Sequence, residues 1–393
     1  TGDLFQARHF GVIIHYGAAH LAGFVKISGG INRDMGVGPK DGFDKLIAKA
    51  RAHGERCPQR KHRQRNSDQR NHGHHADPAL AAARARQNTL TKPPGALGRL
   101  EDLACWLAGW QGREFPRLES VETLVFAGNH GVTAQGVSPY PASVTAQMVE
   151  NFKSGGAAIC QLCEAYGASL SVIALDLERP TADMTLEPAM SADECRDAIA
   201  RGARAVKPGR DVLLLGEMGI GNTTAAAALC CALLGGAAEE WTGPGTGLDA
   251  PGVARKAEVV DRAIGLHGGH CDEPFEALRR LGGRELAAIC GAILEARAQS
   301  IPVLLEGYVC CAAALVLEKA KTGALDHCLG GHLSAEPAHG RLLAALGKTP
   351  VADLGMRLGE GTGASIALGI LRGAVAAHNG MATFADAGID NRE

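Results

Sequence analysis

The chain has 393 residues, of which 46% are hydrophobic, so it holds enough apolar material for a large core and for two or three domains. Glycine is over-represented: 52 residues that follow no repeat, with only 17 prolines, exclude collagen and favour a globular fold with many tight turns. The formal net charge is −2, and the longest apolar run, residues 225–238, is shorter than the roughly 18 residues that span a bilayer, which excludes a membrane span.

Charge is unevenly distributed along the chain. Residues 1–75 carry 13 Lys and Arg against 6 Asp and Glu, whereas the remainder carries 27 against 36, so the larger part is not a general nucleic-acid binder. The stretch 51–75 is almost entirely polar and cannot bury a core. We therefore expect residues 1–75 to form a disordered basic extension, with a nucleic-acid arm or a His-rich metal site at 72–75 as alternatives.

The 12 cysteines predict core packing in a reducing compartment. Two adjacent pairs, Cys230-Cys231 and Cys310-Cys311, lie inside apolar stretches, where thiols most often behave as small core residues. A CxxC spacing at 160–163 has no metal-ligand or thioredoxin context, so neither a zinc site nor a redox site is expected there. This cysteine usage is typical of a cytoplasmic protein.

From residue 77 onward, predicted helices and strands alternate. Pro78 favours a helix over residues 79–90, and a second amphipathic helix is predicted over 97–110. Short apolar runs predict buried strands at 122–127, 170–175, 211–215, 301–305 and 325–329, and helices at 225–234, 284–300, 308–321 and 362–379. This alternation predicts an α/β fold in which helices cover both faces of a parallel sheet.

Four of the predicted strands are followed by loops with glycine or polar residues, at 128–132, 216–224, 306–307 and 330–334. In a parallel sheet, ligands bind beyond the carboxyl ends of the strands, so these loops are expected to gather on one rim. Residues 216–224 are the most informative, because glycines and then Asn222 open a helix, a pattern that predicts an anion site made by backbone N–H groups. The alternative is a tight turn that serves packing. The loop has neither the Walker A sequence nor the usual dinucleotide fingerprint.

A further glycine-rich loop, residues 357–364, places Glu360 between two glycines at the start of a predicted helix. The helix dipole is expected to keep this carboxylate ionised and able to accept a proton. The alternative is that Glu360 only caps its helix. A similar glycine frame around Glu217 favours a functional pair of glutamates.

Several separated motifs, in the same order, resemble the nicotinate-nucleotide–dimethylbenzimidazole phosphoribosyltransferases of the cobalamin nucleotide-loop pathway. Besides the two glutamate loops and Pro141, the matching stretches are 91–101 (TKPPGALGRLE), 126–132 (FAGNHGV), 136–138 (GVS), 144–148 (VTAQM), 155–159 (GGAAI) and 243–248 (GPGTGL). The resemblance covers about residues 77–389. Asn129 stands where many members have Asp, Glu306 replaces the usual Asp, and residues 1–75 have no counterpart.

The resemblance implies a Rossmann-like parallel sheet flanked by helices, with a smaller helical domain built from the N- and C-terminal parts of the core. The implied divisions are the extension at 1–75, the helical part of the small domain at 76–120, the α/β catalytic core at 121–350, and the glutamate loop with the C-terminal helix at 351–393. It also implies a cytoplasmic homodimer that acts on small molecules.

The implied activity is a glycosyltransferase reaction. The 5-phosphoribosyl group of nicotinate mononucleotide passes to 5,6-dimethylbenzimidazole, giving α-ribazole 5′-phosphate and nicotinate. The leaving pyridinium departs as a neutral ring and needs no acid, metal or cofactor, whereas the entering benzimidazole must lose its N–H proton to a base.

The resemblance also assigns roles to residues. Glu360 is implied as the general base, and Glu217 is expected to shape the ribose and ring site. Contacts around the ribose phosphate are expected from Gly219, Gly221, Asn222 and Ser334, and an apolar slot for the acceptor from Pro141, Met148 and Leu358.

Two other functions are weighed against this one. A phosphoribosyltransferase that uses the pyrophosphate-activated sugar usually has two adjacent acidic residues after an apolar strand, but here a single Glu217 follows. A non-catalytic nicotinate-nucleotide-binding or sensor protein on the same fold would lack a base, and Glu360 disfavours it.

Overall fold

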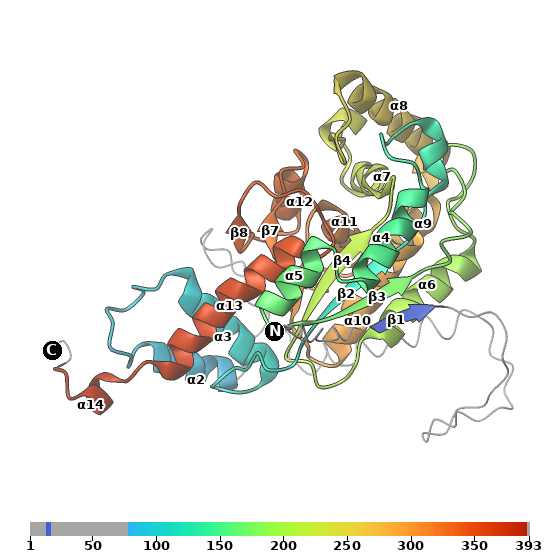
Figure 1. Ribbon diagram of the computed structural model, residues 1–393. Coiled ribbons are helices and arrows are strands. Elements are labelled where there is room, and N and C mark those ends of the chain that lie inside the picture. Colours follow the sequence, from blue (N-terminus) through green and yellow to red (C-terminus); the bar gives the residue numbers. More distant parts are fainter. Residues whose placement is uncertain (1–12, 17–77, 391–393) are drawn as a thin grey trace, which may run out of the picture.

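The computed structural model describes residues 13–16 and 78–390 (Figure 1). Its centre is a six-stranded sheet in which every pair of neighbouring strands is parallel. In spatial order the strands are β1 (Ile13–Tyr16), β3 (Ser169–Ala174), β2 (Val121–Ala127), β4 (Val212–Met218), β5 (Val303–Leu305) and β6 (Cys328–Gly330). The parallel sheet and all five predicted strands are confirmed.

Two details of the sheet differ from the sequence prediction. Strand β1 comes from the N-terminal extension, where disorder was predicted, and pairs with β3 at the edge of the sheet. The rest of residues 1–77, including the His-rich stretch, lies outside the described residues. Strand β6 begins at Cys328, later than predicted, because Leu325 belongs to a turn and is buried for packing without pairing in the ladder.

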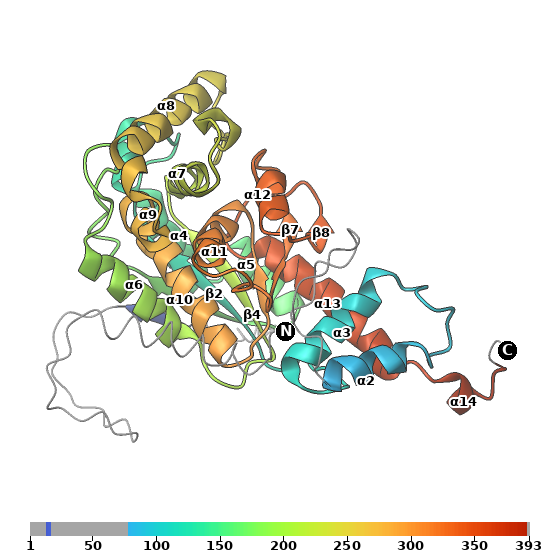
Figure 2. The ribbon, with the colours of Figure 1, turned by 180° about the vertical axis from the view of Figure 1, so that it is seen from behind.

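Strands β2 to β6 are largely buried on both faces, which explains their nearly continuous apolar sequences. In β2, Leu124 and Phe126 face one hydrophobic cluster, whereas Val125 and Ala127 face another. Side chains alternate across a strand, so two layers of helices are needed to cover the sheet. Figures 1 and 2, seen from opposite sides, show these layers.

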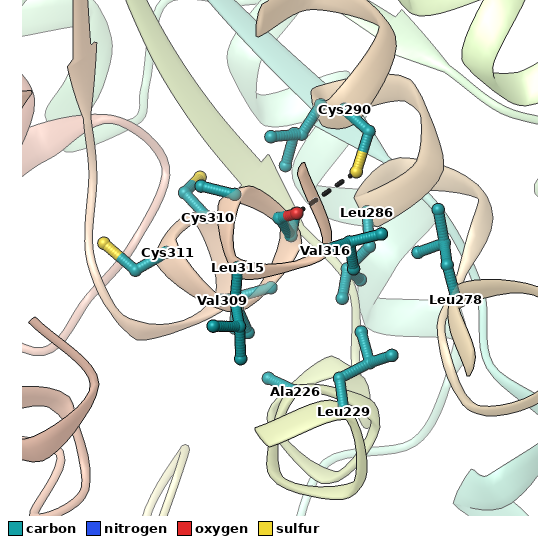
Figure 3. Close-up of a cluster of buried hydrophobic side chains, with 14 of the residues drawn as sticks. Ala226, Leu229, Leu278, Leu286, Cys290, Val309, Cys310, Cys311, Leu315 and Val316 are labelled. Carbon is teal, nitrogen blue, oxygen red and sulfur yellow. Dashed lines mark hydrogen bonds between the residues drawn. The ribbon is translucent and has the colours of Figure 1, made fainter. Parts of the chain in front are cut away.

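The larger layer is built from helices whose apolar residues form one cluster with Leu213 and Leu215 of β4. The helices are α6 (Ala192–Ala205), α7 (Asn222–Leu234), α8 (Ala250–His267), α9 (Pro274–Leu281), α10 (Arg284–Ala298) and α11 (Tyr308–Ala320). Figure 3 shows part of this cluster, in which the Cys290 thiol donates to the carbonyl oxygen of Ala313 at 3.2 Å. The eleven cysteines that the structure describes are all free and buried, as the sequence predicted.

The opposite face is covered in two parts. Helices α4 (Ser143–Lys153) and α5 (Ala158–Ala165) pack on β2 and β3, and α3 (Arg99–Gln111) and α13 (Thr362–Gly380) pack on β4 and β5. Helix α2 (Pro78–Gln87) packs against α3, and α3 packs against α13, so segments from the two ends of the described core lie side by side (Figure 1). This arrangement agrees with a small domain drawn from both ends, and the domain boundaries stay a prediction.

The remaining elements are short. They are α12 (His339–Ala345), α14 (Phe384–Ala387), the parallel pair β7 (His332–Leu333) and β8 (Ala352–Asp353), and the 3₁₀ turns η1 (Gly131–Gln135), η2 (Ala238–Glu240) and η3 (Gly268–His270). No helix within the described ranges is long and apolar enough to cross a membrane.

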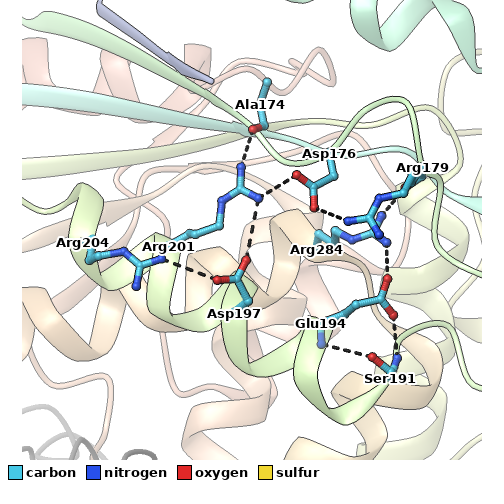
Figure 4. A network of polar contacts seen from close by, with 9 residues as sticks. All are labelled: Ala174, Asp176, Arg179, Ser191, Glu194, Asp197, Arg201, Arg204 and Arg284. Carbon is cyan, nitrogen blue, oxygen red and sulfur yellow. Dashed lines mark hydrogen bonds and ion pairs between the residues drawn. The ribbon is translucent and has the colours of Figure 1, made fainter. Parts of the chain in front are cut away.

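A polar network joins β3 to α6 and to the start of α10 (Figure 4). Arg201 of α6 donates to Asp176 at 3.0 Å and to the last carbonyl of β3 at 2.7 Å. Arg284, nearly buried, pairs at 2.6 Å with Glu194, whose capping box with Ser191 begins α6. The network therefore ties the N-terminus of α10 to the N-terminus of α6.

The strand order locates the site. After β2 the chain passes to β3 on one side and then to β4 on the other, so the connections reverse direction between β2 and β4. In doubly wound sheets, the crevice at such a reversal binds the ligand. β2 is followed by the loop 128–132, which the sequence singled out. β4 is longer than predicted and includes Gly216, Glu217 and Met218, so of the predicted loop 216–224 only residues 219–221 lie between β4 and α7.

Candidate active site

The loops after β2 and β4 touch each other at the carboxyl edge of the sheet. The Gly128 N–H donates to the Met218 carbonyl oxygen at 3.0 Å. A Cβ placed on Gly219 would lie 2.8 Å from the Gly128 carbonyl oxygen, so a side chain at 219 would push the loops apart. The predicted gathering of loops on one rim is therefore confirmed here, and glycine is required for it.

The loop after β4 leads into α7 without a side-chain cap. The helix begins at Asn222 with Gly221, at φ 94°, as its N-cap residue, and no side chain caps it. The Asn222 amide instead donates to the Glu217 carboxylate. The Ile220 N–H donates to the Thr145 hydroxyl of α4 at 3.1 Å, which ties the motif at 144–148 to this loop.

A buried lysine that sequence reasoning missed lies behind the first turn of α7. Lys256 of α8 is only 1% exposed, and its Nζ donates to the Thr223 hydroxyl at 2.8 Å and to the Gly243 carbonyl oxygen at 3.1 Å. Burial lowers the pKa of Lys256 to about 8. Its position on the core-facing side of an amphipathic helix was the only signal in the sequence.

The Glu360 loop lies directly over the end of β4. Gly359, Glu360 and Gly361 have φ values of 83°, 66° and 94°, a left-handed run that the two glycines allow. The Glu360 N–H donates to the Glu217 carbonyl oxygen at 3.2 Å. A Cβ on Gly216 would lie 2.5 Å from the Gly361 nitrogen. The structure thus brings Glu217 and Glu360 together, as their glycine frames predicted.

The pKa values of Glu217 and Glu360 are both raised well above the ordinary value for glutamate. Burial, followed by the nearby carboxylates of Glu285, Glu306 and Glu360, raises the pKa of Glu217 to about 8, although the Asn222 amide opposes this shift. Burial, followed by the Glu306 charge, raises the pKa of Glu360 to about 7. The Glu360 Oε2 atom is buried and has no hydrogen-bond partner within the described residues.

The expectation that the helix dipole keeps Glu360 ionised is therefore wrong. The N-terminus of α13 is occupied by another carboxylate, Glu306, which accepts from the N–H groups of Gly363 at 3.0 Å and Ala364 at 2.8 Å. Glu360 precedes the helix in a left-handed conformation, so burial dominates its ionisation. Glu306 in turn lies 3.4 Å from the Nε2 atom of His332.

A second buried pair that the sequence did not reveal lies under the 216–224 loop. His130, in the loop after β2, contacts the Glu285 carboxylate of α10 through Nε2. A Cβ on Gly219 would lie 3.0 Å from Glu285 Oε1. Glu285 stands in an apolar helix next to Arg284 of the polar network, and nothing in its sequence context marks it as part of the site.

The other predicted contact residues are less tightly assembled. Ser334 is buried, and its hydroxyl accepts from the Glu336 N–H at 3.3 Å. Pro141 is exposed just before α4, Met148 is half-buried on that helix, and Leu358 is 58% exposed beside Gly359. The acceptor slot and the phosphate contacts therefore stay predictions. Among the residues that the structure describes, no group of three or more His, Cys, Asp or Glu is arranged to hold a metal ion.

Comparisons with known proteins agree with the resemblance seen in the sequence. A family model described as "Phosphoribosyltransferase" matches residues 74–389. The nicotinate-nucleotide–dimethylbenzimidazole phosphoribosyltransferase of Rhizobium meliloti is 58% identical over 315 residues, which are 80% of this chain and 93% of that protein. The enzyme of the same name from Novosphingobium aromaticivorans is 58% identical over 311 residues, 79% of this chain and 92% of the relative.

A solved structure shares the fold. The crystal structure of CobT from Thermus thermophilus superposes with a TM-score of 0.75 at 43% identity, covering 80% of this chain and 99% of that chain. The matched region of the family model begins at residue 74, so the extension that contributes β1 lies outside it.

Proposed function

The chain belongs to the nicotinate-nucleotide–dimethylbenzimidazole phosphoribosyltransferase family, and we propose that Glu360 is the general base of the reaction it catalyses. The enzyme transfers the 5-phosphoribosyl group of nicotinate mononucleotide to 5,6-dimethylbenzimidazole and releases α-ribazole 5′-phosphate and nicotinate. The C1′–N bond to the pyridinium breaks, and its electron pair stays on the ring nitrogen, which leaves as neutral pyridine. One benzimidazole nitrogen attacks C1′, and the proton on the other nitrogen passes to Glu360.

The environment of Glu360 supports this role. A general base works best when its pKa lies near the operating pH, and burial together with the Glu306 charge raises the pKa of Glu360 to about 7. The unpartnered Oε2 atom keeps a lone pair available for an incoming N–H group. This buried, unpartnered carboxylate at the reversal point of the sheet is the observation that carries the proposal.

Glu217 is assigned a positioning role. Because burial raises the pKa of Glu217 to about 8, its carboxyl group is largely protonated at neutral pH and is able to donate a hydrogen bond. Its other oxygen accepts from the Asn222 amide, which fixes the orientation of the group. A ribose hydroxyl is the matching acceptor, and Glu217 would orient the sugar for attack at C1′.

Phosphate binding is assigned to the start of α7. Gly219, Gly221 and Asn222 line this turn, and the buried Lys256 ammonium behind Thr223 adds positive charge to that of the helix N-terminus. Ser334 would add a hydroxyl from the loop after β7. Pro141, Met148 and Leu358 would border the flat aromatic acceptor.

A turnover assay tests the function directly. Purified protein is incubated with nicotinate mononucleotide and dimethylbenzimidazole, and free nicotinate and α-ribazole 5′-phosphate are separated by chromatography. Release of both products in equal amounts is expected. A sensor protein on the same fold would instead bind the nucleotide without releasing nicotinate.

The proposal also includes the oligomeric state and the cellular compartment of the protein. We infer a homodimer, supported by the family resemblance. We also infer a cytoplasmic location, supported by the free, buried state of the eleven described cysteines. Sedimentation of the purified protein over a range of concentrations tests the dimer, and a single species of monomer mass would contradict it.

A further inference from the structure

The carboxylate of Glu306 lies at the helix start that follows Glu360, close enough for its charge to act on Glu360. Glu306 follows β5, is 1% exposed, and accepts from the two N–H groups of Gly363 and Ala364 at 3.0 and 2.8 Å. The Thr362 hydroxyl lies 3.4 Å from the same carboxylate. Glu306 therefore holds the first turn of α13, which begins two residues after Glu360.

Glu306 is itself fixed from the opposite side. The Nε2 atom of His332 lies 3.4 Å from its Oε1 atom. A Cβ on Gly363 would lie 2.1 Å from the His332 ring, and one on Gly307 would lie 3.2 Å from Nε2 of that ring, so the imidazole is wedged between two glycines. The carboxylate consequently has little freedom to move away from α13.

The groups that face Glu360 from neighbouring elements are mostly acidic or weakly polar. Glu217 approaches from β4, Glu306 from the end of β5, and the Cys160 thiol from α5. The His332 ring lies beside Glu306 and Gly363. On its own loop, Arg357 is exposed and donates to the Gly245 carbonyl oxygen at 2.9 Å. The positive end of the α13 dipole is already taken by Glu306.

We propose that Glu306 is a positioning residue for proton abstraction by Glu360, holding the α13 N-terminus beneath the Glu360 loop and opposing ionisation of Glu360 through its own negative charge. This inference rests on the proposed role of Glu360. With the Glu306 charge in place, Glu360 holds the proton taken from the benzimidazole more strongly. The raised pKa of Glu360 agrees with this assignment.

Rate–pH profiles of charge-removing and charge-keeping variants test the proposal. Glu306→Gln and the smaller Glu306→Ser remove the charge, and Glu306→Asp keeps it. In both neutral variants the acidic limb of kcat/KM should move to lower pH by about one unit, the effect of one nearby like charge. For a wild-type limb whose midpoint lies near pH 7, kcat/KM at pH 6, expressed relative to its plateau value, should then rise about fivefold. The plateau itself should fall a few-fold, because a weaker base abstracts the proton more slowly.

Glu273→Gln is the matched control. The Glu273 carboxylate accepts from two backbone N–H groups at the N-terminus of α9, at 3.2 and 2.6 Å, as Glu306 does at α13. Its variant should lose a comparable helix cap while the acidic limb stays at the wild-type pH. The limb of Glu306→Asp should also stay there.

A purely structural Glu306 would lower the plateau of the neutral variants and leave their acidic limb in place, and that result would overturn the proposal. The role of Glu360 is tested separately by Glu360→Gln. If that variant keeps the wild-type rate, the assignment of the base fails. If it is inactive while the neutral Glu306 variants keep a wild-type limb, only the inference about Glu306 fails.

Discussion

Replacing Glu360 by Gln should make the enzyme slower and, at alkaline pH, more stable. The side chain keeps its size and part of its hydrogen-bonding capacity but loses the ability to accept a proton. General-base catalysis of this kind is typically worth about 10²–10⁴ in rate. Turnover of Glu360→Gln should fall by that factor, while the affinity for nicotinate mononucleotide stays close to that of the wild type.

The stability change follows from the raised pKa. Glu360 has a pKa of about 7 in the folded chain, against an ordinary value of 4.5. A raised carboxyl pKa contributes stability that is fully present below about pH 4.5 and is lost as pH rises through about 7. At roughly 1.4 kcal/mol per pKa unit, the ionised carboxylate lowers the free energy of unfolding by up to about 3 kcal/mol at pH 8.

Urea unfolding of wild type and Glu360→Gln at pH 5 and at pH 8 measures this difference. The variant should be close to the wild type at pH 5 and more stable at pH 8. Glu164→Gln, at an exposed position on α5, is the control and should show no such pH dependence. Equal stabilities of Glu360→Gln and wild type at pH 8, or near-normal turnover of the variant, would refute the argument and move the base to Glu217.

Three further outcomes are expected. Glu217→Gln should weaken nucleotide binding as much as turnover, which ligand titration and steady-state kinetics compare; a loss confined to kcat would contradict a positioning role. Gly216→Ala should reduce kcat strongly with a smaller change in nucleotide affinity, because its Cβ would lie 2.5 Å from the Gly361 nitrogen and would displace the Glu360 loop. Activity should be unchanged in excess EDTA, since the pyridine leaves as a neutral ring; a loss that added Mg²⁺ restores would favour a pyrophosphate-activated sugar instead.

Strands β2 to β6 could be predicted from the sequence because they are largely buried on both faces and therefore stand out as apolar runs, whereas β1 was not predicted. The proximity of Glu217 and Glu360 could also be predicted, since each residue stands next to glycines, Glu217 at the end of a strand and Glu360 before the start of a helix. Lys256 and Glu285 could not, because each lies in an ordinary helix and reaches the site only through tertiary packing. The ionisation of Glu360 was predicted wrongly for the same reason. The sequence shows where the helix starts, but it does not show that Glu306 occupies the N-terminus of that helix.

The glycine excess and the perturbed glutamates have a common structural cause. A Cβ on Gly359 would lie 2.6 Å from Glu217 Oε1, and one on Gly216 would lie 2.5 Å from the nitrogen of Gly361, so the end of β4 and the Glu360 loop leave no room for a side chain at either glycine. Glu360 is consequently buried and Glu217 half-buried, and burial together with the nearby carboxylates raises the pKa values of both groups. A larger residue at Gly216 or Gly359 would separate the end of β4 from the Glu360 loop and admit water. The pKa of Glu360 would then fall towards its ordinary value, and Glu360 would be a poorer base near pH 7.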